Sequence, residues 1–327
     1  VRAIAREPLV ADPVSARLDL RGRLWVVEMP DYPLGPPEGT PPSGRIKILT
    51  DGDRDGVFDQ ATLFAEGLLF ATGVQPYRDG AFVTLAGKIS FFRDLDGDDQ
   101  ADEVIELFSG FAEQNQQLRA NHPTLGPDGL IYVAGGLRGG SVQALDSRFA
   151  PQEGPVDLRD RDFCFDPEGG WWGAIPGKSQ FGVTLDDFGR RLGCSNRNPA
   201  MMSVLSLAAV QRDPMLVARD AIHDVALSAE KSAVFSRADA WTTSNLHSGQ
   251  FSAACGVFAP GWTDDSGEWL LACEPTAYLI QRQKLVRDGS VWMSRREPDQ
   301  DEFLSSTDTW FRPVDLTAGP QESALVV

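Results

Sequence analysis

"HPTLGPDGLIYVAGG" occupies residues 122–136 and sets a pattern that recurs along the whole chain. A short lead-in is followed by Pro-Asp-Gly, and a run of hydrophobic residues comes next. Proline fixes the backbone at the start of a turn, aspartate bonds to its own backbone, and glycine accepts a positive φ. The stretch therefore predicts a β-hairpin whose second strand is buried.

Five further segments repeat this pattern of lead-in, polar turn and hydrophobic strand. They are "ARLDLRGRLWVVEM" (16–29), "GVQPYRDGAFVTLAG" (73–87), "FGVTLDDFGRRLGCSN" (181–196), "CGVFAPGWTDDSGEWLLACEP" (255–275) and "RPVDLTAGPQESALVV" (312–327). A repeat of roughly 50–70 residues fits blades of four strands, each burying its faces against two neighbours. We therefore expect an all-β, six-bladed β-propeller, with a pair of β-sandwiches as the alternative.

The rest of the chain fits a single propeller domain over residues 1–327. Helical periodicity is confined to a short insertion around 199–214. The sixth copy ends the sequence, so the last blade is predicted to be incomplete at the C-terminus. The N-terminal segment "VRAIAREPLVAD" is expected to supply one of its outer strands.

Charge and cysteine content narrow the range of partners. The formal net charge of −17 repels nucleic acid and anionic lipid, and no apolar run reaches the ~20 residues of a membrane helix. The four cysteines form no C-x-x-C motif. Cys255 could pair with Cys273, and Cys164 with Cys194, or all four could be buried thiols. We expect an exported protein, periplasmic or extracellular, because such compartments permit disulfides.

Two acidic loops suggest metal binding. Aspartates fill positions 1, 3, 5 and 9 of both loops, and a backbone carbonyl at position 7 is a further ligand; these residues are Asp51, Asp53, Asp55, Val57 and Asp59, then Asp94, Asp96, Asp98, Gln100 and Asp102. Oxygen-rich loops of this kind suit calcium. Neither loop has the closing glutamate of an EF-hand, and both lie between strand-like runs. They therefore predict structural calcium sites on outer hairpins, with solvated acidic turns as the alternative.

The wording of four segments resembles one protein family: "EPLVADPVSARLDLRGRLWVVEMPDYP", "GRIKILTDGDRDGVFDQATLFAEGL", "NQQLRANHPTLGPDGLIYVAGGLRGG" and "STDTWFRPVDLTAGP". They resemble propeller domains named as membrane-bound dehydrogenases in planctomycete-type bacteria. That group is similar in turn to the soluble quinoprotein glucose (aldose sugar) dehydrogenases. The resemblance implies calcium, the cofactor pyrroloquinoline quinone (PQQ), oxidation of a sugar hydroxyl and a cytochrome c as electron acceptor.

Two positions depart from the sugar-dehydrogenase pattern. Leu118 stands where those enzymes place a histidine base, eight residues before Gly126, and leucine cannot accept a proton. Lys178 in "KSQFG" stands where they place an arginine that contacts the cofactor. His122 and Arg119 are accordingly the candidate catalytic residues of this chain.

Ligands of propellers usually bind at the mouth of the central channel, beside the innermost strands. The candidate cofactor-binding residues there are Arg138, Lys178, Arg197, Asn198, His247 and Arg312. A structural role is the alternative for each, such as tying neighbouring loops together. Two other functions remain open: a non-catalytic propeller that binds carbohydrate, small or polymeric, or a protein, and a lyase or hydrolase of acidic polysaccharide that uses His122 or His247.

Overall fold

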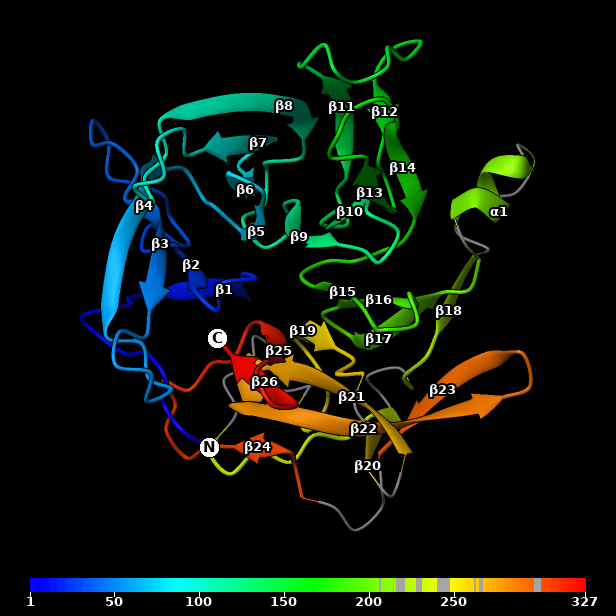
Figure 1. Ribbon diagram of the computed structural model, residues 1–327. Coiled ribbons are helices and arrows are strands. Elements are labelled where there is room, and N and C mark those ends of the chain that lie inside the picture. Colours follow the sequence, from blue (N-terminus) through cyan, green and yellow to red (C-terminus); the bar gives the residue numbers. More distant parts are fainter. Residues whose placement is uncertain are drawn as a thin grey trace.

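The protein is almost entirely β-structure, as a computed structural model shows (Figure 1). The structure describes residues 1–205, 207–213, 215, 221–227, 231–239, 248–261, 263–264, 267–296 and 301–327. In these residues the strands form six antiparallel sheets. Besides them we find a short helix, α1 (Leu207–Arg212), and a 3₁₀ turn at Pro275–Ala277.

The first three sheets occupy the first half of the chain. The first contains β1 (Pro13–Leu18), β2 (Leu24–Glu28), β3 (Gly44–Thr50) and β4 (Gln60–Leu68). The second contains β5 (Gly73–Tyr77), β6 (Gly80–Leu85), β7 (Lys88–Arg93), β8 (Glu103–Phe111), β11 (Gly140–Ala144) and β12 (Val156–Asp157). The third contains β9 (Asn121–Leu125), β10 (Ile131–Ala134), β13 (Arg161–Phe165) and β14 (Trp172–Pro176).

The other three sheets follow. The fourth contains β15 (Val183–Leu185), β16 (Arg191–Ser195), β17 (Asn198–Ser203) and β18 (Ile222–Asp224). The fifth contains β19 (Cys255–Phe258), β20 (Thr263–Asp264), β21 (Gly267–Glu274), β22 (Leu279–Asp288), β23 (Val291–Arg295) and β24 (Leu304–Ser305). The sixth has two strands in the described residues, β25 (Leu316–Gly319) and β26 (Ser323–Val326).

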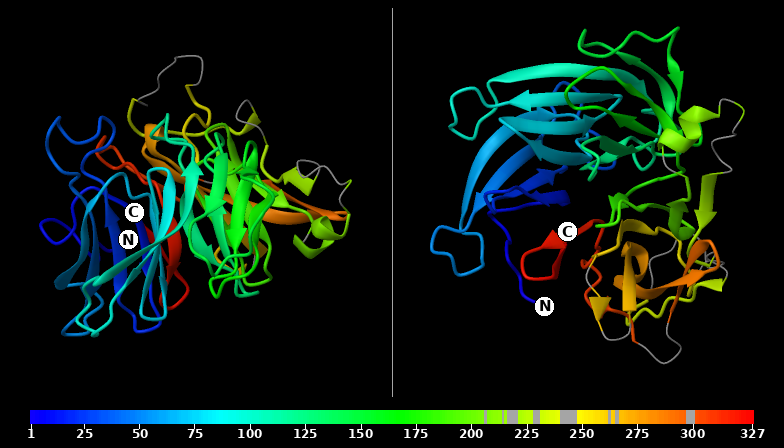
Figure 2. Two further views of the ribbon diagram at one scale, coloured as in Figure 1. Left: turned by 90° about the horizontal axis from the view of Figure 1, so that it is seen from above. Right: turned by 45° about the vertical axis from the view of Figure 1, so that its right-hand side comes forward.

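The sheets are arranged in a ring. The first strand of each sheet contacts the first strand of the next, in the order β1, β5, β9, β15, β19 and β25, and β25 contacts β1 again. In Figures 1 and 2 the red hairpin β25–β26 accordingly lies between the blue first sheet and the yellow fifth sheet. The fold is therefore the predicted β-propeller, and the β-sandwich alternative is wrong.

All six repeat segments form the inner hairpins of this ring. In the hairpin first quoted, β9 pairs with β10, and Gly129 takes a φ of 83° at the turn. The Asp128 carboxylate accepts hydrogen bonds from the Leu130 backbone N–H, at 3.3 Å, and from the Tyr132 hydroxyl, at 2.7 Å. Local turn chemistry thus forms this hairpin, and its hydrophobic second strand, β10, is buried as expected.

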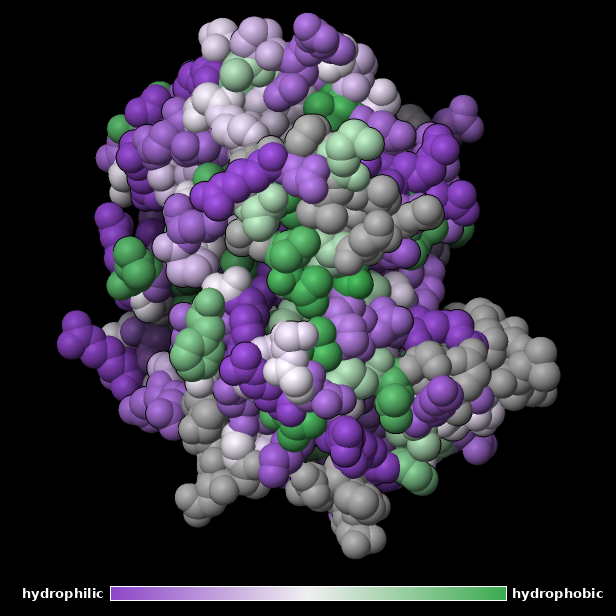
Figure 3. Space-filling view, turned by 90° about the vertical axis from the view of Figure 1, so that its right-hand side faces the viewer, coloured by the Kyte–Doolittle hydropathy of each residue, from purple (hydrophilic) through white to green (hydrophobic). Residues whose placement is uncertain are grey.

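The hydrophobic cores lie between neighbouring sheets. Phe108 of the second sheet packs edge-on against Phe163 of the third, with ring centroids 5.0 Å apart. Similar clusters fill the space between the first and second sheets and between the fourth and fifth. Burial of this apolar surface is what holds successive sheets together. The remaining surface is largely hydrophilic on the side that carries α1 and β23, where hydrophobic atoms form small separate groups (Figure 3).

Two expectations about the chain were wrong in part. Among the described residues of the predicted helical insertion 199–214, only α1 is helical. Residues 199–203 belong to β17 instead, because Met201 and Met202 pair with strands on both sides and are buried. Residues 1–12 form no strand; they pack against the first sheet, where the Phe58 N–H donates to the Ile4 carbonyl.

The strand order assigns each loop to one of two faces. Consecutive strands of a sheet run antiparallel. The segment that leads into the innermost strand therefore lies at the same end of the ring as the loop between the second and third strands. We call this end the mouth face; it comprises residues 29–43, 69–72, 86–87, 112–120, 135–139, 177–182, 196–197, 275–278 and 306–315. The opposite face comprises residues 19–23, 51–59, 78–79, 94–102, 126–130, 186–190, 289–290 and 320–322.

Candidate ligand-binding face and the centre of the ring

His122 lies at the start of an innermost strand, β9, with a φ of 50°. The matching positions of three other first strands are glycines: Gly73, Gly182 and Gly256. A Cβ on Gly73 would lie 2.8 Å from the His122 nitrogen, and one on Gly182 would lie 2.9 Å from the Gly256 nitrogen. The backbones therefore approach closely around the axis, where His122 carries a large side chain.

Asp315 is the centre of a buried polar cluster at the axis. Its Oδ2 accepts hydrogen bonds from Arg17 Nη1 (2.7 Å) and Ser15 Oγ (3.0 Å), and its Oδ1 lies 3.0 Å from His122 Nε2. The side chains of Asp315 and His122 are 1% and 2% exposed. Asp315 directly precedes β25, so this one carboxylate connects the sixth sheet to the first and the third.

Neighbouring charges determine the ionisation of Asp315. Burial alone would raise its pKa, but the positive charges of Arg17 and His122 and their hydrogen bonds hold the pKa well below its usual range. The carboxylate is therefore ionised at neutral pH, and it faces the Arg17 guanidinium and the His122 ring inside the propeller.

The hydrogen bonds around Asn121 determine which atoms the two ring nitrogens of His122 face. The Asn121 amide nitrogen donates to the backbone carbonyls of Arg119 and Gln180, and its oxygen accepts from the Gly182 N–H. That oxygen lies 2.8 Å from His122 Nδ1, so Nδ1 carries a proton. Nε2 faces the Asp315 carboxylate at ion-pair distance without the alignment of a good hydrogen bond. Both nitrogens thus face acceptor oxygens.

This arrangement places His122 at the centre of the ring, as expected, but encloses it. Phe181 covers the ring edge-to-face, with centroids 4.7 Å apart. Neither nitrogen is directed to solvent, so the ring as placed cannot take a proton from a bound sugar. A catalytic role for His122 remains a prediction.

Arg119 lies on the mouth face and is 8% exposed. Its guanidinium stacks on Phe70 at 4.1 Å and donates from Nε and Nη2 to the Glu113 carbonyl. Its Nη1 is buried and has no partner among the described residues. Burial lowers the pKa of Arg119, although Glu113 partly opposes this. An unpaired buried donor is costly, which marks Nη1 as a point where an acceptor would be favourable.

Arg138 and Lys178 lie on two loops, 135–139 and 177–182, that neighbour the loop of Arg119. A Cβ on Gly136 would lie 2.4 Å from the Arg119 carbonyl oxygen, and the Gly136 N–H donates to the Ser179 carbonyl at 3.0 Å. The loops 112–120, 135–139 and 177–182 are therefore in contact. Arg138 is exposed and Lys178 half-buried, and neither side chain makes a hydrogen bond or ion pair with the described part of the chain.

Arg197 and Arg312 also lie on the mouth face, and Asn198 begins β17 beside it. Arg197 Nη2 donates to the Gln250 side chain at 3.1 Å, and Asn198 donates to Asp224 at 2.8 Å. Arg312 Nε donates to the Thr309 carbonyl, close to the exposed Trp310. His247 lies outside the described residues. Among the described residues, the loops that carry Arg119, Arg138 and Lys178 contact one another, and Gln180 of the third loop also bonds to Asn196, next to Arg197.

The sequence interpretation missed three buried carboxylates at the mouth face. Glu28 accepts the Ala11 N–H and pairs with Arg45 and Lys47. Asp162 accepts the Gly135 and Ser179 N–H groups, and Glu274 accepts those of Ser252 and Ala253.

Burial raises the pKa of Asp162 and of Glu274, although their hydrogen bonds partly oppose the rise. Each of the three acids binds the backbone of a segment that leads toward an innermost strand. They therefore fix the loops of this face.

The two acidic loops lie on the opposite face, in outer hairpins. One carboxylate oxygen each from Asp51, Asp53 and Asp55 lies within 4.8 Å of the others, and the same holds for Asp94, Asp96 and Asp102. At position 6 of the loops, Gly56 and Asp99 take φ values of 86° and 65°.

Backbone N–H groups converge on the carboxylates of these loops. Burial would raise the pKa of Asp51, but the N–H groups of Gly56 and Asp55 lower it. Each loop thus presents several ionised oxygens on a tight turn.

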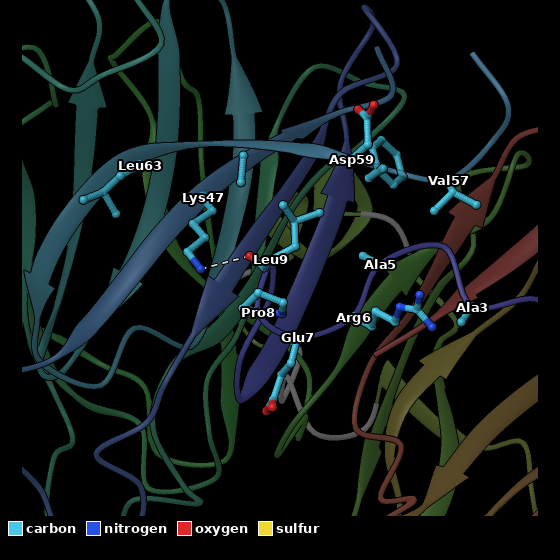
Figure 4. A pocket seen from close by; sticks show the side chains of 12 residues that line it. Ala3, Ala5, Arg6, Glu7, Pro8, Leu9, Lys47, Val57, Asp59 and Leu63 are labelled. Atoms are coloured by element: carbon cyan, nitrogen blue, oxygen red, sulfur yellow. Dashed lines mark hydrogen bonds between the residues drawn. The ribbon is translucent and has the colours of Figure 1, made fainter. Parts of the chain in front are cut away.

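A groove of about 740 Å³ runs between residues 3–9 and the first sheet (Figure 4). Leu9 and Pro8 form one wall, Leu63 of β4 lies opposite, and Lys47 donates to the Leu9 carbonyl at 2.9 Å. No predicted catalytic or cofactor-binding residue lines it. No described helix has the length and apolar character to span a membrane.

Comparison with solved structures shows the fold. The chain is 13% identical to the PQQ domain of a pyranose dehydrogenase from Coprinopsis cinerea, with a TM-score of 0.52 over 97% of this chain and 90% of that one. A glucose dehydrogenase is 12% identical, with a TM-score of 0.53 over 97% and 93%. A luciferin-regenerating enzyme is 10% identical, with a TM-score of 0.52 over 94% and 80%.

At these identities the likeness concerns the propeller fold, since function depends on the site. No curated protein sequence matches the chain. One family model covers all of residues 1–327, and the chain belongs to that family, described as "Domain of unknown function (DUF7133)".

Proposed function

We propose that the mouth face binds an anionic quinone, PQQ, and that the protein is a quinoprotein-like oxidoreductase of sugar hydroxyls. The observation that carries this proposal is that the three loops bearing Arg119, Arg138 and Lys178 contact one another. In a chain of net charge −17, unpaired cationic donors on adjacent loops favour an anionic ligand. The similar solved propellers include one named as a PQQ domain, which supports the choice of quinone.

The donors present fit the carboxylates of PQQ. Arg119 Nη1 is a buried donor without a partner, and an arginine can hold a carboxylate through directed hydrogen bonds. Lys178 supplies a point charge where the sugar dehydrogenases place an arginine, so it orients a carboxylate less strictly. When bound, PQQ supplies the acceptor for the hydride of the sugar. The residues of this chain would hold and orient it, with Asp162 and its bonds to Gly135 and Ser179 fixing the two loops.

A second function is favoured because, in the described part of the chain, neither Leu118 nor His122 offers an accessible base. Leu118 occupies the base position, and both nitrogens of His122 face acceptors. A propeller that binds carbohydrate without oxidising it needs no such base. The mouth face would then bind an acidic sugar through Arg119, Arg138 and Lys178. The lyase or hydrolase alternative needs an accessible histidine; His122 is enclosed, and His247 lies outside the described residues.

We further propose that the loops 51–59 and 94–102 bind calcium as structural ions. Convergent carboxylates without a cation repel each other, and calcium takes six to eight oxygens at about 2.3–2.6 Å. Because both loops lie on the face opposite Arg119, their ions would stabilise outer hairpins and take no part in the chemistry.

The test is binding of PQQ to the protein with calcium, followed by desalting, absorbance and dye reduction with a panel of sugars. Arg119→Met should weaken PQQ binding about ten- to hundredfold, since it removes hydrogen bonds to a charged group. Arg21→Met, on an exposed arginine of the opposite face, is the matched control and should bind normally.

Three results are distinguishable. Binding with sugar-dependent dye reduction supports the first function. Binding of acidic glycans on an array, without PQQ uptake, supports the second and overturns the first. If Arg119→Met still bound PQQ and acidic glycans as wild type does, the three touching loops would not be the site.

A further inference from the structure

Two cysteines lie directly opposite each other on neighbouring strands. Cys255 is the first residue of β19, and its register partner on β21 is Cys273. Both side chains are buried, and both belong to one cluster that also contains Leu271 and Ile280. Both are free thiols in the structure.

This register matches the geometry of a disulfide. Direct partners in an antiparallel pair point to the same side of the sheet, with Cα atoms about 4.5–5.5 Å apart. Disulfides join Cα atoms about 4.4–6.8 Å apart. The other two cysteines have no such partner: Cys164 lies opposite Tyr132 and Gly173 in the third sheet, and Cys194 lies in the fourth.

We infer that Cys255 and Cys273 are a disulfide site, oxidised by exchange with a small-molecule disulfide before the fifth sheet is fully packed. One cysteine thiolate attacks the oxidant and forms a mixed disulfide, and one thiol leaves. The other cysteine thiolate attacks the protein sulfur of that mixed disulfide, and the second thiol leaves. Two protein thiols lose their protons and two electrons, and the oxidant is reduced to two thiols.

Burial explains why exchange must precede packing. Desolvation raises the pKa of both thiols well above the usual range, so few thiolates exist once the sheet is formed. The same burial would protect the finished bond from reductants. The site is therefore one that is set during folding and then retained.

The bond would lie next to the segment that carries Asp315 of the polar cluster. Cys255 Sγ lies 3.9 Å from the Pro313 carbonyl oxygen, and a Cβ on Gly256 would lie 2.9 Å from Asp315 Cα. A cross-link at Cys255 thus fixes the strand against which the Asp315 segment packs. We expect oxidation to raise the melting temperature for this reason, as well as by restricting the unfolded chain.

The experiment compares protein refolded from denaturant with reductant alone and with a mixture of reduced and oxidised glutathione. Thiols are then alkylated under denaturing conditions and located by peptide mass mapping. The reduced sample should contain four free thiols, and the oxidised sample two, with Cys255 linked to Cys273 and a higher melting temperature. Cys164→Ser should still lose two thiols on oxidation, whereas Cys273→Ser should lose none.

Two results would overturn the inference. One is four free thiols after refolding with oxidised glutathione to a native melting transition. The other is a bond that involves Cys194, the remaining thiol near this pair. Mapping of the wild-type protein alone decides between these results, even if Cys273→Ser fails to fold.

Discussion

Replacing Asp315 by asparagine should severely weaken the closure of the ring. Asparagine has nearly the same size, but it keeps only one of the two oxygens that accept from Ser15 and Leu316, and it removes the negative charge that faces Arg17 and His122. Removing one partner of a buried ion pair leaves an uncompensated charge and costs about 3–5 kcal/mol. The range applies because the carboxylate is 1% exposed and Arg17 pairs with it at 2.7 Å.

The assay is urea unfolding of Asp315→Asn beside Asp160→Asn, an exposed aspartate whose φ of 54° asparagine also tolerates. The control should lie within about 0.5 kcal/mol of wild type. The double variant Arg17→Met with Asp315→Asn should lose less unfolding free energy than the sum of the losses in the two single variants. In the double variant, neither charge of this pair is left buried without its partner. A loss below about 1 kcal/mol in Asp315→Asn would refute the view that this carboxylate closes the ring.

The acid limb of stability gives an independent check. The pKa of Asp315 is lower in the folded protein than in an unfolded chain, where aspartate titrates near 3.9. Its contribution to the free energy of unfolding is therefore complete above about pH 4 and is lost as the pH falls toward the folded pKa. Asp315→Asn should accordingly lose less stability than wild type between neutral pH and pH 3. An equal acid-induced loss in both proteins would argue against this ionisation.

Three further predictions test other parts of the fold. Asp53→Ala should lower the melting temperature in calcium but not in chelator, and should leave binding at the mouth face unchanged; equal melting with and without calcium in wild type would contradict the metal site. Gly256→Ala should cost more than Gly289→Ala by about 1–3 kcal/mol in urea unfolding, since both have a positive φ but only Gly256 packs against Val314 and Asp315. Glu274→Gln should reduce the loss of stability as the pH rises above about 4, because the pKa of Glu274 is raised in the folded state, and an unchanged pH profile of unfolding would contradict this.

The inner hairpins were predictable because their signals are local. A turn such as Gly126–Gly129 and the hydrophobic strand that follows it lie within about ten residues, so the sequence shows both together. The same reasoning located the acidic loops between outer strands. It failed for residues 199–203, where two methionines satisfy a helical pattern as well as a strand and only pairing with β16 and β18 decides.

The polar centre of the ring was beyond such reasoning. Ser15 and Asp315 are 300 positions apart, and no local pattern around either one indicates the other. Asp315 was not selected as a site residue, although His122 was. The signal that could have identified it is its position directly before β25, the innermost strand of the sixth sheet. A carboxylate buried at the axis there requires cationic partners from other sheets.

The division between the two faces follows from hairpin topology alone. Loops joining first to second and third to fourth strands must lie opposite those that enter the first strands, so the residues at 51–59 and those at 112–120 cannot share a site. An ion at Asp53 can therefore influence ligand binding only through the stability of the whole ring. Arg119 and Asp315, in contrast, are linked through two residues. Asn121 donates to the Arg119 carbonyl and accepts from His122, and His122 Nε2 lies 3.0 Å from Asp315 Oδ1. A ligand that takes up Arg119 Nη1 should thus affect ring closure, and ligand-induced melting shifts should be smaller in Asp315→Asn than in the calcium-loop variant.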